Sequence, residues 1–315
     1  MEYVKLGKTE LIVSRLCFGG LIIGPLQANL SIDEGSEVIA SAFRLGVNFI
    51  DTAELYKTYG YIKKAIEMTG IRPIVSTKCY AYTKDGAAES LERARRELDM
   101  DVIDIFMLHE QESRMTLRGH RDALEYFINA KEKGMIKAVG VSTHNIEVVR
   151  ACAEMQEIDV IHPLLNKSGI GIKDGTVEEM LGAIKLANDN GKGIYSMKAL
   201  GGGNLAADYE ASMKFVLDLP YVHSIAVGMQ SVEEVIMNVD VFEGRKTDSK
   251  LKATLSLKKK RLHIDSFCEG CGKCAERCKQ NAIKIKNGKA VVDGKKCTLC
   301  SYCAAVCPQF AIKIC

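Results

Sequence analysis

Eight of the twelve cysteines lie in two blocks near the C-terminus, with a spacing typical of iron–sulfur ligands. In this spacing, three close thiolates bind one [4Fe–4S] cluster, and the fourth cysteine of each block binds the other cluster. We therefore predict one cluster bound by Cys268, Cys271, Cys274 and Cys307, and a second bound by Cys297, Cys300, Cys303 and Cys278.

A zinc ribbon is the competing interpretation, because soft thiolates bind zinc as well as iron–sulfur clusters. Zinc sites normally use paired C-x-x-C motifs separated by a longer loop, and neither block has that arrangement. The spacing therefore favours two clusters. The remaining cysteines are expected to be free thiols: Cys17, Cys79, Cys152 and Cys315.

The two cysteine blocks are an internal repeat, offset by the 29 residues that separate Cys268 from Cys297. A short strand pattern follows each block, at residues 280–285 and 309–314, and Asn287-Gly288 between them predicts a type I′ hairpin. Residues 263–315 resemble a two-cluster bacterial ferredoxin of α+β structure over its whole length. Lys279 replaces the usual proline after the first block, whereas Pro308 is kept. So small a domain depends on its clusters for much of its stability.

Composition and charge limit the partners and the location to be expected. The net charge of +3 is too small to indicate binding of nucleic acid. We find no signal peptide and no apolar run of membrane-spanning length, so we expect a cytoplasmic protein without membrane contact. The basic run Lys258-Lys259-Lys260-Arg261 is either a solvated linker or a docking patch for an acidic partner. The domains expected are residues 1–250, a basic linker at 251–262, and residues 263–315.

The large domain alternates short apolar runs with amphipathic helical stretches. Most runs are continuous instead of alternating, as in parallel strands that are buried on both faces. They are residues 15–20, 48–53, 73–79, 102–109, 136–142, 160–166, 193–200 and 224–229. Eight such units predict an α/β fold, the (β/α)₈ or TIM barrel. A doubly wound open sheet is the alternative, but no G-x-G-x-x-G follows the first strand. Residues 3–6 and 11–13 are expected to form a hairpin at the barrel floor.

Polar residues follow three consecutive strands, where chemistry in such a barrel takes place. Asp51 and Tyr56 follow the second strand, Lys78 ends the third, and His109 ends the fourth. Each has a structural explanation when taken alone, for example a rim cation or a hydrogen-bonded core histidine. Because neighbouring strands place all four at one point, together they indicate a catalytic site.

This group of four residues suits carbonyl reduction. A carbonyl that receives hydride develops negative charge on oxygen and needs a proton. A phenol is a weak acid, with a reference pKa of about 10. The Lys78 ammonium, held by Asp51, is expected to lower the pKa of Tyr56. His109 can donate to the substrate oxygen and orient it.

The residues Asp51-Thr52-Ala53 with Tyr56, Ser-Thr-Lys78, Leu-His109 and Gly140-Val141-Ser142 resemble the aldo-keto reductases, in order and spacing, over the whole barrel. The resemblance implies that Tyr56 is the general acid, Lys78 adjusts its pKa, Asp51 is the partner of Lys78, and His109 orients the carbonyl. The fusion is similar to the ferredoxin-bearing branch of that family.

The same resemblance implies a nicotinamide site that departs from the family pattern. Ser142 is kept, Thr143 replaces an asparagine, His162 replaces a glutamine, and Asn166 matches. Met197 replaces the stacking aromatic residue, and Gly228 and Asn238 align with the adenine-nucleotide loop. Gln230 and Glu234 stand where a basic residue usually contacts the 2′-phosphate of NADP, so the choice between NADP and NAD is open. Two interpretations of His162 and Lys198 remain, a structural role and a reshaped pocket.

The sequence thus predicts an oxidoreductase that interconverts a small carbonyl compound and an alcohol and that can exchange electrons with a ferredoxin or another redox protein. The alternative is an electron-transfer protein whose barrel docks a partner or binds another ligand. A barrel ending near Lys250 is expected to keep its own chemistry. No flavin motif is present to connect hydride transfer with one-electron clusters.

Overall fold

The computed structural model describes residues 1–249, 251 and 261–314. Most of the predicted basic linker, including Lys258 to Lys260, lies outside the described residues, as does Cys315. Within the described ranges, no helix has the length and apolar character needed to cross a membrane.

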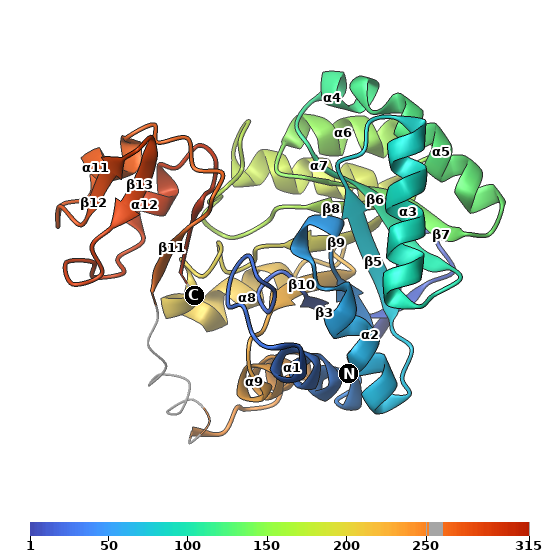
Figure 1. Ribbon diagram of the computed structural model, residues 1–315, viewed down its shortest axis with the longest axis horizontal. Coiled ribbons are helices and arrows are strands. Elements are labelled where there is room, and N and C mark those ends of the chain that lie inside the picture. The colour runs from blue at the N-terminus through green and yellow to red at the C-terminus, as the bar shows by residue number, and fades with distance from the viewer. Residues whose placement is uncertain (250, 252–260, 315) are drawn as a thin grey trace.

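Eight parallel strands close into a barrel, and each coincides with one of the predicted apolar runs (Figure 1). They are β3 (Leu16–Gly19), β4 (Phe49–Asp51), β5 (Ile74–Cys79), β6 (Ile103–Gln111), β7 (Ile136–Thr143), β8 (Val160–Pro163), β9 (Gly193–Met197) and β10 (Ser224–Gly228). Neighbours along the chain pair in parallel, and β10 pairs with β3 to complete the circle. The prediction of a (β/α)₈ barrel is therefore confirmed, and the open sheet is excluded.

Helices surround the barrel and cover the outer faces of its strands (Figure 1). Capping boxes begin two of these helices: Ser31 with Glu34 before residues 32–44, and Thr176 with Glu179 before residues 177–189. The helices are α1 (Ile32–Arg44), η1 (Glu54–Tyr56), α2 (Tyr59–Thr69), α3 (Lys84–Leu98), α4 (Arg114–Gly119), α5 (Arg121–Glu132), α6 (Ile146–Glu154), α7 (Val177–Asp189), η2 (Ala206–Asp208), α8 (Tyr209–Leu217) and α9 (Val232–Phe242).

An antiparallel hairpin, β1 (Tyr3–Lys5) with β2 (Ile12–Ser14), closes the amino-terminal end of the barrel as predicted. The Lys8 amide donates to the carbonyl of Gly191 (2.9 Å), just before β9. Gly7 has φ +57°, and a Cβ there would lie 2.3 Å from the Gly193 nitrogen. Only glycine fits this contact, which holds the hairpin against the strand bottoms.

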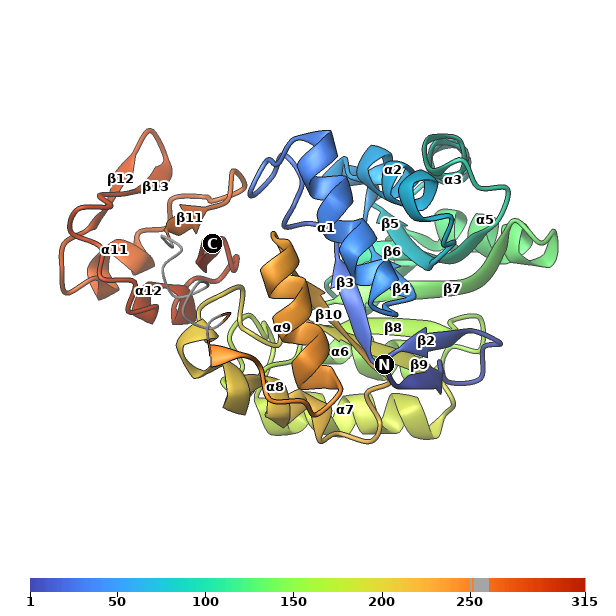
Figure 2. The same ribbon diagram turned by 90° about the horizontal axis from the view of Figure 1, so that it is seen from below.

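The cluster-binding domain lies beside the barrel, as the two views show (Figures 1 and 2). Its elements are β11 (Leu262–Ile264), α11 (Lys273–Arg277), β12 (Ile283–Lys286), β13 (Lys289–Val292), α12 (Tyr302–Ala305) and β14 (Ile312–Ile314). β11 pairs with β14 and β12 with β13, both antiparallel. Asn287 (φ +49°) and Gly288 (φ +72°) have the two positive φ angles of the predicted type I′ turn.

Strand β14 lies on the barrel loop that follows β9. The Ile314 amide donates to the carbonyl of Gly202 (3.0 Å), and Asn204 Nδ2 donates to the carbonyl of Ile312 (3.2 Å). Phe310, just before β14, is 1% exposed and is covered by barrel residues. The C-terminal strand therefore contacts the rim of the barrel.

Candidate active site

Asp51 and Lys78 form a buried ion pair at the carboxyl ends of β4 and β5. Lys78 Nζ donates to Asp51 Oδ1 (2.7 Å), to Asp51 Oδ2 (2.8 Å) and to the carbonyl of Thr52 (2.6 Å). An ammonium has three protons to donate, so every proton of Lys78 is accepted. The lysine is therefore fixed in position by three acceptors although it is only 1% exposed.

Tyr56, in η1, and His109, in β6, meet directly above this pair. The Tyr56 hydroxyl lies 3.4 Å from His109 Nε2, and Lys78 Nζ lies 5.0 Å from the centre of the Tyr56 ring. The ring of Tyr80 stacks on His109 at a centroid distance of 4.4 Å. Burial, together with the charge of Lys78, lowers the pKa of His109 to about 3. The structure thus brings all four predicted residues together and keeps the imidazole neutral.

The pKa of Tyr56 differs from the prediction. Burial raises it well above its usual value, and the negative charges of Asp51 and Glu110 raise it further. The net shift is therefore opposite to the lowering expected from Lys78, because burial has the larger effect on the pKa of Tyr56. The consequence is a fully protonated phenol at neutral pH, which is the form a proton donor needs.

Tyr195, in β9, supports Asp51 and was not singled out from the sequence. Its hydroxyl donates to Asp51 Oδ1 (2.8 Å) and lies 2.8 Å from Ser76 Oγ. Although burial alone would raise the pKa of Asp51, the charges of Lys78 and His162 hold it below its usual value. In the sequence, a tyrosine within an apolar strand is indistinguishable from an aromatic core residue. The one available signal is its hydroxyl, because a buried hydroxyl usually needs a hydrogen-bond partner.

His162, which the sequence predicts to contact nicotinamide, packs against Tyr195 and lies near Asp51. Its ring stacks on Tyr195 at 3.9 Å, Nδ1 lies 2.6 Å from the carbonyl of Tyr195, and Nε2 lies 3.7 Å from Asp51 Oδ1. Burial lowers the pKa of His162 to about 4. Of the two interpretations left open, these contacts favour the structural one, although His162 also lines the cavity described next.

A cavity of about 630 Å³ opens above the group of four. It lies within the size range of small-molecule sites in proteins. Tyr56 and Asp51 line one part, and residues from the start of α9 line another. Of the predicted nicotinamide contacts, four line the cavity: His162, Met197, Gly228 and Asn238. Lys313 and Ile314 of the cluster-binding domain also line it, which no sequence pattern predicted.

The other three predicted nicotinamide contacts do not line this cavity and are engaged elsewhere. Ser142 Oγ accepts from the Glu110 amide (2.8 Å), and Thr143 Oγ1 donates to the carbonyl of Gln111 (2.7 Å). Asn166 Nδ2 donates to the carbonyl of Ile170 (2.9 Å) and so holds the loop after β8. In this conformation these residues shape the rim of the barrel.

The part of the cavity lined by Gln230 and Glu234, where the sequence predicts the nucleotide end, contains a carboxylate. Glu234 Oε2 accepts from the Gln230 amide (2.9 Å), and both residues line the cavity. Arg245, which could have replaced the missing basic residue, is paired with Asp240 (2.9 Å). Glu234 would repel a 2′-phosphate placed beside it.

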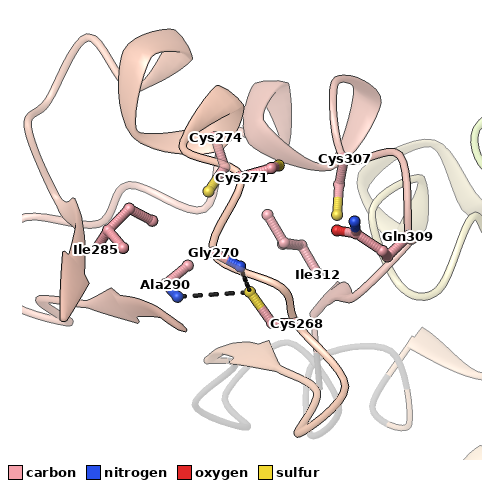
Figure 3. A pocket seen from close by; sticks show the side chains of 9 residues that line it. All are labelled: Cys268, Gly270, Cys271, Cys274, Ile285, Ala290, Cys307, Gln309 and Ile312. Atoms are coloured by element: carbon pink, nitrogen blue, oxygen red, sulfur yellow. Dashed lines mark hydrogen bonds between the residues drawn. The ribbon is translucent and has the colours of Figure 1, made fainter. Parts of the chain in front are cut away.

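The first predicted set of cluster ligands surrounds one pocket, although its members come from both cysteine blocks. Figure 3 shows Cys268, Cys271, Cys274 and Cys307 around it, with the apolar side chains of Ile285, Ala290 and Ile312. The donor set fits a cubane cluster, because one thiolate is available for each of its four irons. Cys268 Sγ accepts from the amides of Gly270 (3.4 Å) and Ala290 (3.5 Å).

Three members of the second predicted set belong to the apolar core of this domain: Cys303 is buried in it, and Cys278 and Cys297 pack against it. The fourth, Cys300, is exposed. Cys278 lies at the end of α11, where its Sγ accepts from the Ala282 amide (3.3 Å). Cys307 makes the equivalent contact with the Ala311 amide (3.3 Å), so the internal repeat extends to the hydrogen bonds that tune such clusters.

Comparisons with known proteins cover both parts of the chain. Residues 15–213 match the aldo/keto reductase family, and residues 267–312 match a 4Fe-4S dicluster domain. An L-galactose dehydrogenase from Arabidopsis thaliana is 27% identical over 218 residues, which are 65% of this chain and 67% of that protein. An uncharacterised oxidoreductase from Bacillus subtilis is 23% identical over 310 residues, 84% of this chain and 98% of that protein.

The fold is also found among solved structures. The holo form of an aldo-keto reductase from Bacillus halodurans superimposes with a TM-score of 0.65 at 20% identity, covering 81% of this chain and 95% of that one. At this identity the likeness concerns the barrel fold alone.

Proposed function

The chain belongs to the aldo/keto reductase family and is an oxidoreductase with a 4Fe-4S dicluster domain, and on this basis we propose that it interconverts a carbonyl compound and an alcohol at the cavity above Tyr56. One observation supports the proposal most directly: the Tyr56 hydroxyl lies 3.4 Å from His109 Nε2, next to the buried ion pair of Lys78 and Asp51. The substrate is a small molecule, in keeping with the cavity volume of about 630 Å³.

The proton chemistry follows from the charges of the site. A carbonyl oxygen that contacts both Tyr56 and His109 accepts a hydrogen bond from the phenol and, in the Nε2–H tautomer, from the imidazole. As hydride arrives, negative charge grows on this oxygen and the phenol transfers its proton. The phenolate that remains lies beside the Lys78 ammonium, whose distance to the ring centre is 5.0 Å. Lys78 therefore stabilises the state after proton transfer, whereas burial keeps Tyr56 protonated before it.

A nicotinamide cofactor would supply the hydride. Met197, Gly228 and Asn238 line the cavity and are the residues proposed to hold it. Glu234 and Gln230 stand at the predicted nucleotide end, and among the residues that the structure describes no basic side chain is paired with Glu234. We therefore propose that the protein does not select NADP over NAD.

A second function is favoured by one specific observation: Lys313 and Ile314 of the cluster-binding domain line the barrel cavity. Cys307 precedes this segment by only a few residues, so the cluster that it would bind lies close to the cavity. This arrangement supports an electron-transfer protein whose barrel binds another ligand and whose partner is a ferredoxin or similar redox protein.

The test of the first proposal is Tyr56→Phe, with Tyr82→Phe as a matched control on an exposed tyrosine (65% exposed). Anaerobic protein is assayed against a panel of aldehydes and ketones with NADPH and NADH. Tyr56→Phe should reduce kcat at least about a hundredfold, the low end for positioned acid catalysis, while nicotinamide binding, followed by its fluorescence, survives. Full turnover in Tyr56→Phe, or no binding of either nucleotide, would favour the electron-transfer alternative.

A further inference from the structure

Two lysines from different domains meet at one aromatic ring on the edge of the cavity. Lys198 follows β9 of the barrel, and Lys313 lies in β14 of the cluster-binding domain. Lys313 Nζ lies 3.4 Å from the centre of the Phe310 ring, and Lys198 Nζ lies 4.6 Å from it. Both lysines line the cavity that contains Tyr56.

These two lysines have fewer hydrogen-bond acceptors than Lys78, which has three. Within the described residues, Lys198 Nζ has one hydrogen-bond partner, His144 Nε2 at 2.8 Å. Lys313 Nζ donates to the carbonyl of Phe310, and its carboxylate neighbour, Asp265, is 3.6 Å away. Two like charges this close repel each other, and burial adds a desolvation cost. Protons thus remain available beside the cavity for an anionic ligand.

The backbone of Lys198 has an unfavourable conformation that the surrounding turn maintains. Its φ is +63°, a left-handed conformation that costs a non-glycine residue free energy. The Gly201 amide donates to the Lys198 carbonyl (2.7 Å) and closes the turn. Backbone strain of this kind persists where the surrounding structure enforces it, and here it directs the side chain to the cavity edge.

Lys198 lies on the side of the cavity where the four catalytic candidates are. Its charge is one of the causes that lower the pKa of His109. Its partner His144 lies 3.6 Å from Glu110, the residue after His109. These contacts connect Lys198 to the segment that contains His109. Glu234 stands instead at the predicted nucleotide end.

We propose that Lys198 and Lys313 together bind an anionic group of the substrate, so that the carbonyl compound carries a carboxylate or a phosphate. The proposal names the substrate class of the proposed reaction and rests on it. Because Lys313 belongs to the cluster-binding domain, substrate recognition then requires both domains.

The experiment measures binding of oxalate, and of its neutral analogue oxamide, to the full-length anaerobic protein by calorimetry. We expect oxalate to bind and to compete with carbonyl substrate. Lys198→Met and Lys313→Met should each weaken oxalate binding at least tenfold, or 1.4 kcal/mol, without changing the weak binding of oxamide. Lys185→Met on α7 and Lys284→Met on β12 remove the same charge from exposed positions and should leave oxalate binding unchanged.

Three results would overturn the proposal: no oxalate binding by the wild type, equal oxalate binding by all variants, or a loss of NADH binding in place of oxalate binding, which would assign the lysines to the nucleotide. None of them depends on turnover. Failure of the proposed carbonyl reduction is detected separately, with neutral aldehydes and Tyr56→Phe.

Discussion

Gly203 is the residue at which the contact between the two domains can be broken most specifically. It has φ +84°, and a Cβ at this position would lie 1.9 Å from the carbonyl oxygen of Ile314. Since backbone cannot yield as a flexible side chain does, Gly203→Ala should force β14 away from the barrel loop. Two hydrogen bonds would be lost, Ile314 to Gly202 and Asn204 to Ile312.

The magnitude follows from these contacts. Each hydrogen bond contributes about 0.5–1.5 kcal/mol net, so docking should weaken by about 1–3 kcal/mol. This corresponds to an increase of roughly 5- to 150-fold in the undocked population. The left-handed φ adds a further cost of about 1 kcal/mol for alanine, which affects the stability of the barrel but not docking itself.

Hydrogen exchange of the Ile314 amide measures the docking, because its acceptor belongs to the barrel. In Gly203→Ala its exchange should accelerate by that factor. The Asp265 amide, whose acceptor is Ala311 within the same domain (2.8 Å), should be unaffected.

Gly134→Ala is the matched control, since Gly134 has φ +75° and its Cβ would have no atom within 4 Å. It carries the same φ cost without the clash. If Ile314 stays protected in Gly203→Ala, or if Gly134→Ala exposes it equally, the contact does not hold the domains together and the reasoning is wrong.

Two further predictions concern the cofactors. Anaerobically prepared protein should contain about eight irons and eight sulfides. Cys274→Ala should lose one cluster and keep the other, which iron analysis and electron paramagnetic resonance can follow. Stoichiometric zinc without iron would contradict the assignment. Dissociation constants for NADPH and NADH should be similar, because Glu234 repels the 2′-phosphate. Glu234→Gln should strengthen the binding of NADPH alone. A hundredfold preference of the wild type for NADPH, about 2.7 kcal/mol, would show that another residue binds the phosphate.

The barrel could be predicted from the sequence because its strands are buried on both faces. Such strands produce continuous apolar runs, and residues such as Lys78 and His109 at their ends stand out against them. Convergence of the group of four then follows from barrel geometry alone. The pKa of Tyr56 could not be predicted, because it depends first on how deeply the hydroxyl is buried and then on the negative charges of Asp51 and Glu110.

The contact between the domains depends on residues far apart in the chain, which no local pattern relates. The internal repeat nevertheless contained a clue. Phe310 occupies the position of Asn281 in the first block, and both have a positive φ, +53° and +48°. Asparagine is usual there, whereas phenylalanine is not. An apolar ring at a strained position indicates a tertiary contact, and here the contact is with the barrel.

The position of Cys307 has a consequence for how the cell controls this protein. Cys307 is a predicted cluster ligand, and the segment that follows it supplies Lys313 and Ile314 to the wall of the cavity. Cluster assembly therefore shapes the pocket as well as the redox centre. We expect chains without clusters to bind an anionic substrate weakly, because Lys313 would no longer be held in the cavity wall. Iron starvation or oxygen damage would then weaken this substrate binding without any change in the abundance of the protein, whereas the sequence alone led us to expect that a barrel ending near Lys250 keeps its own chemistry.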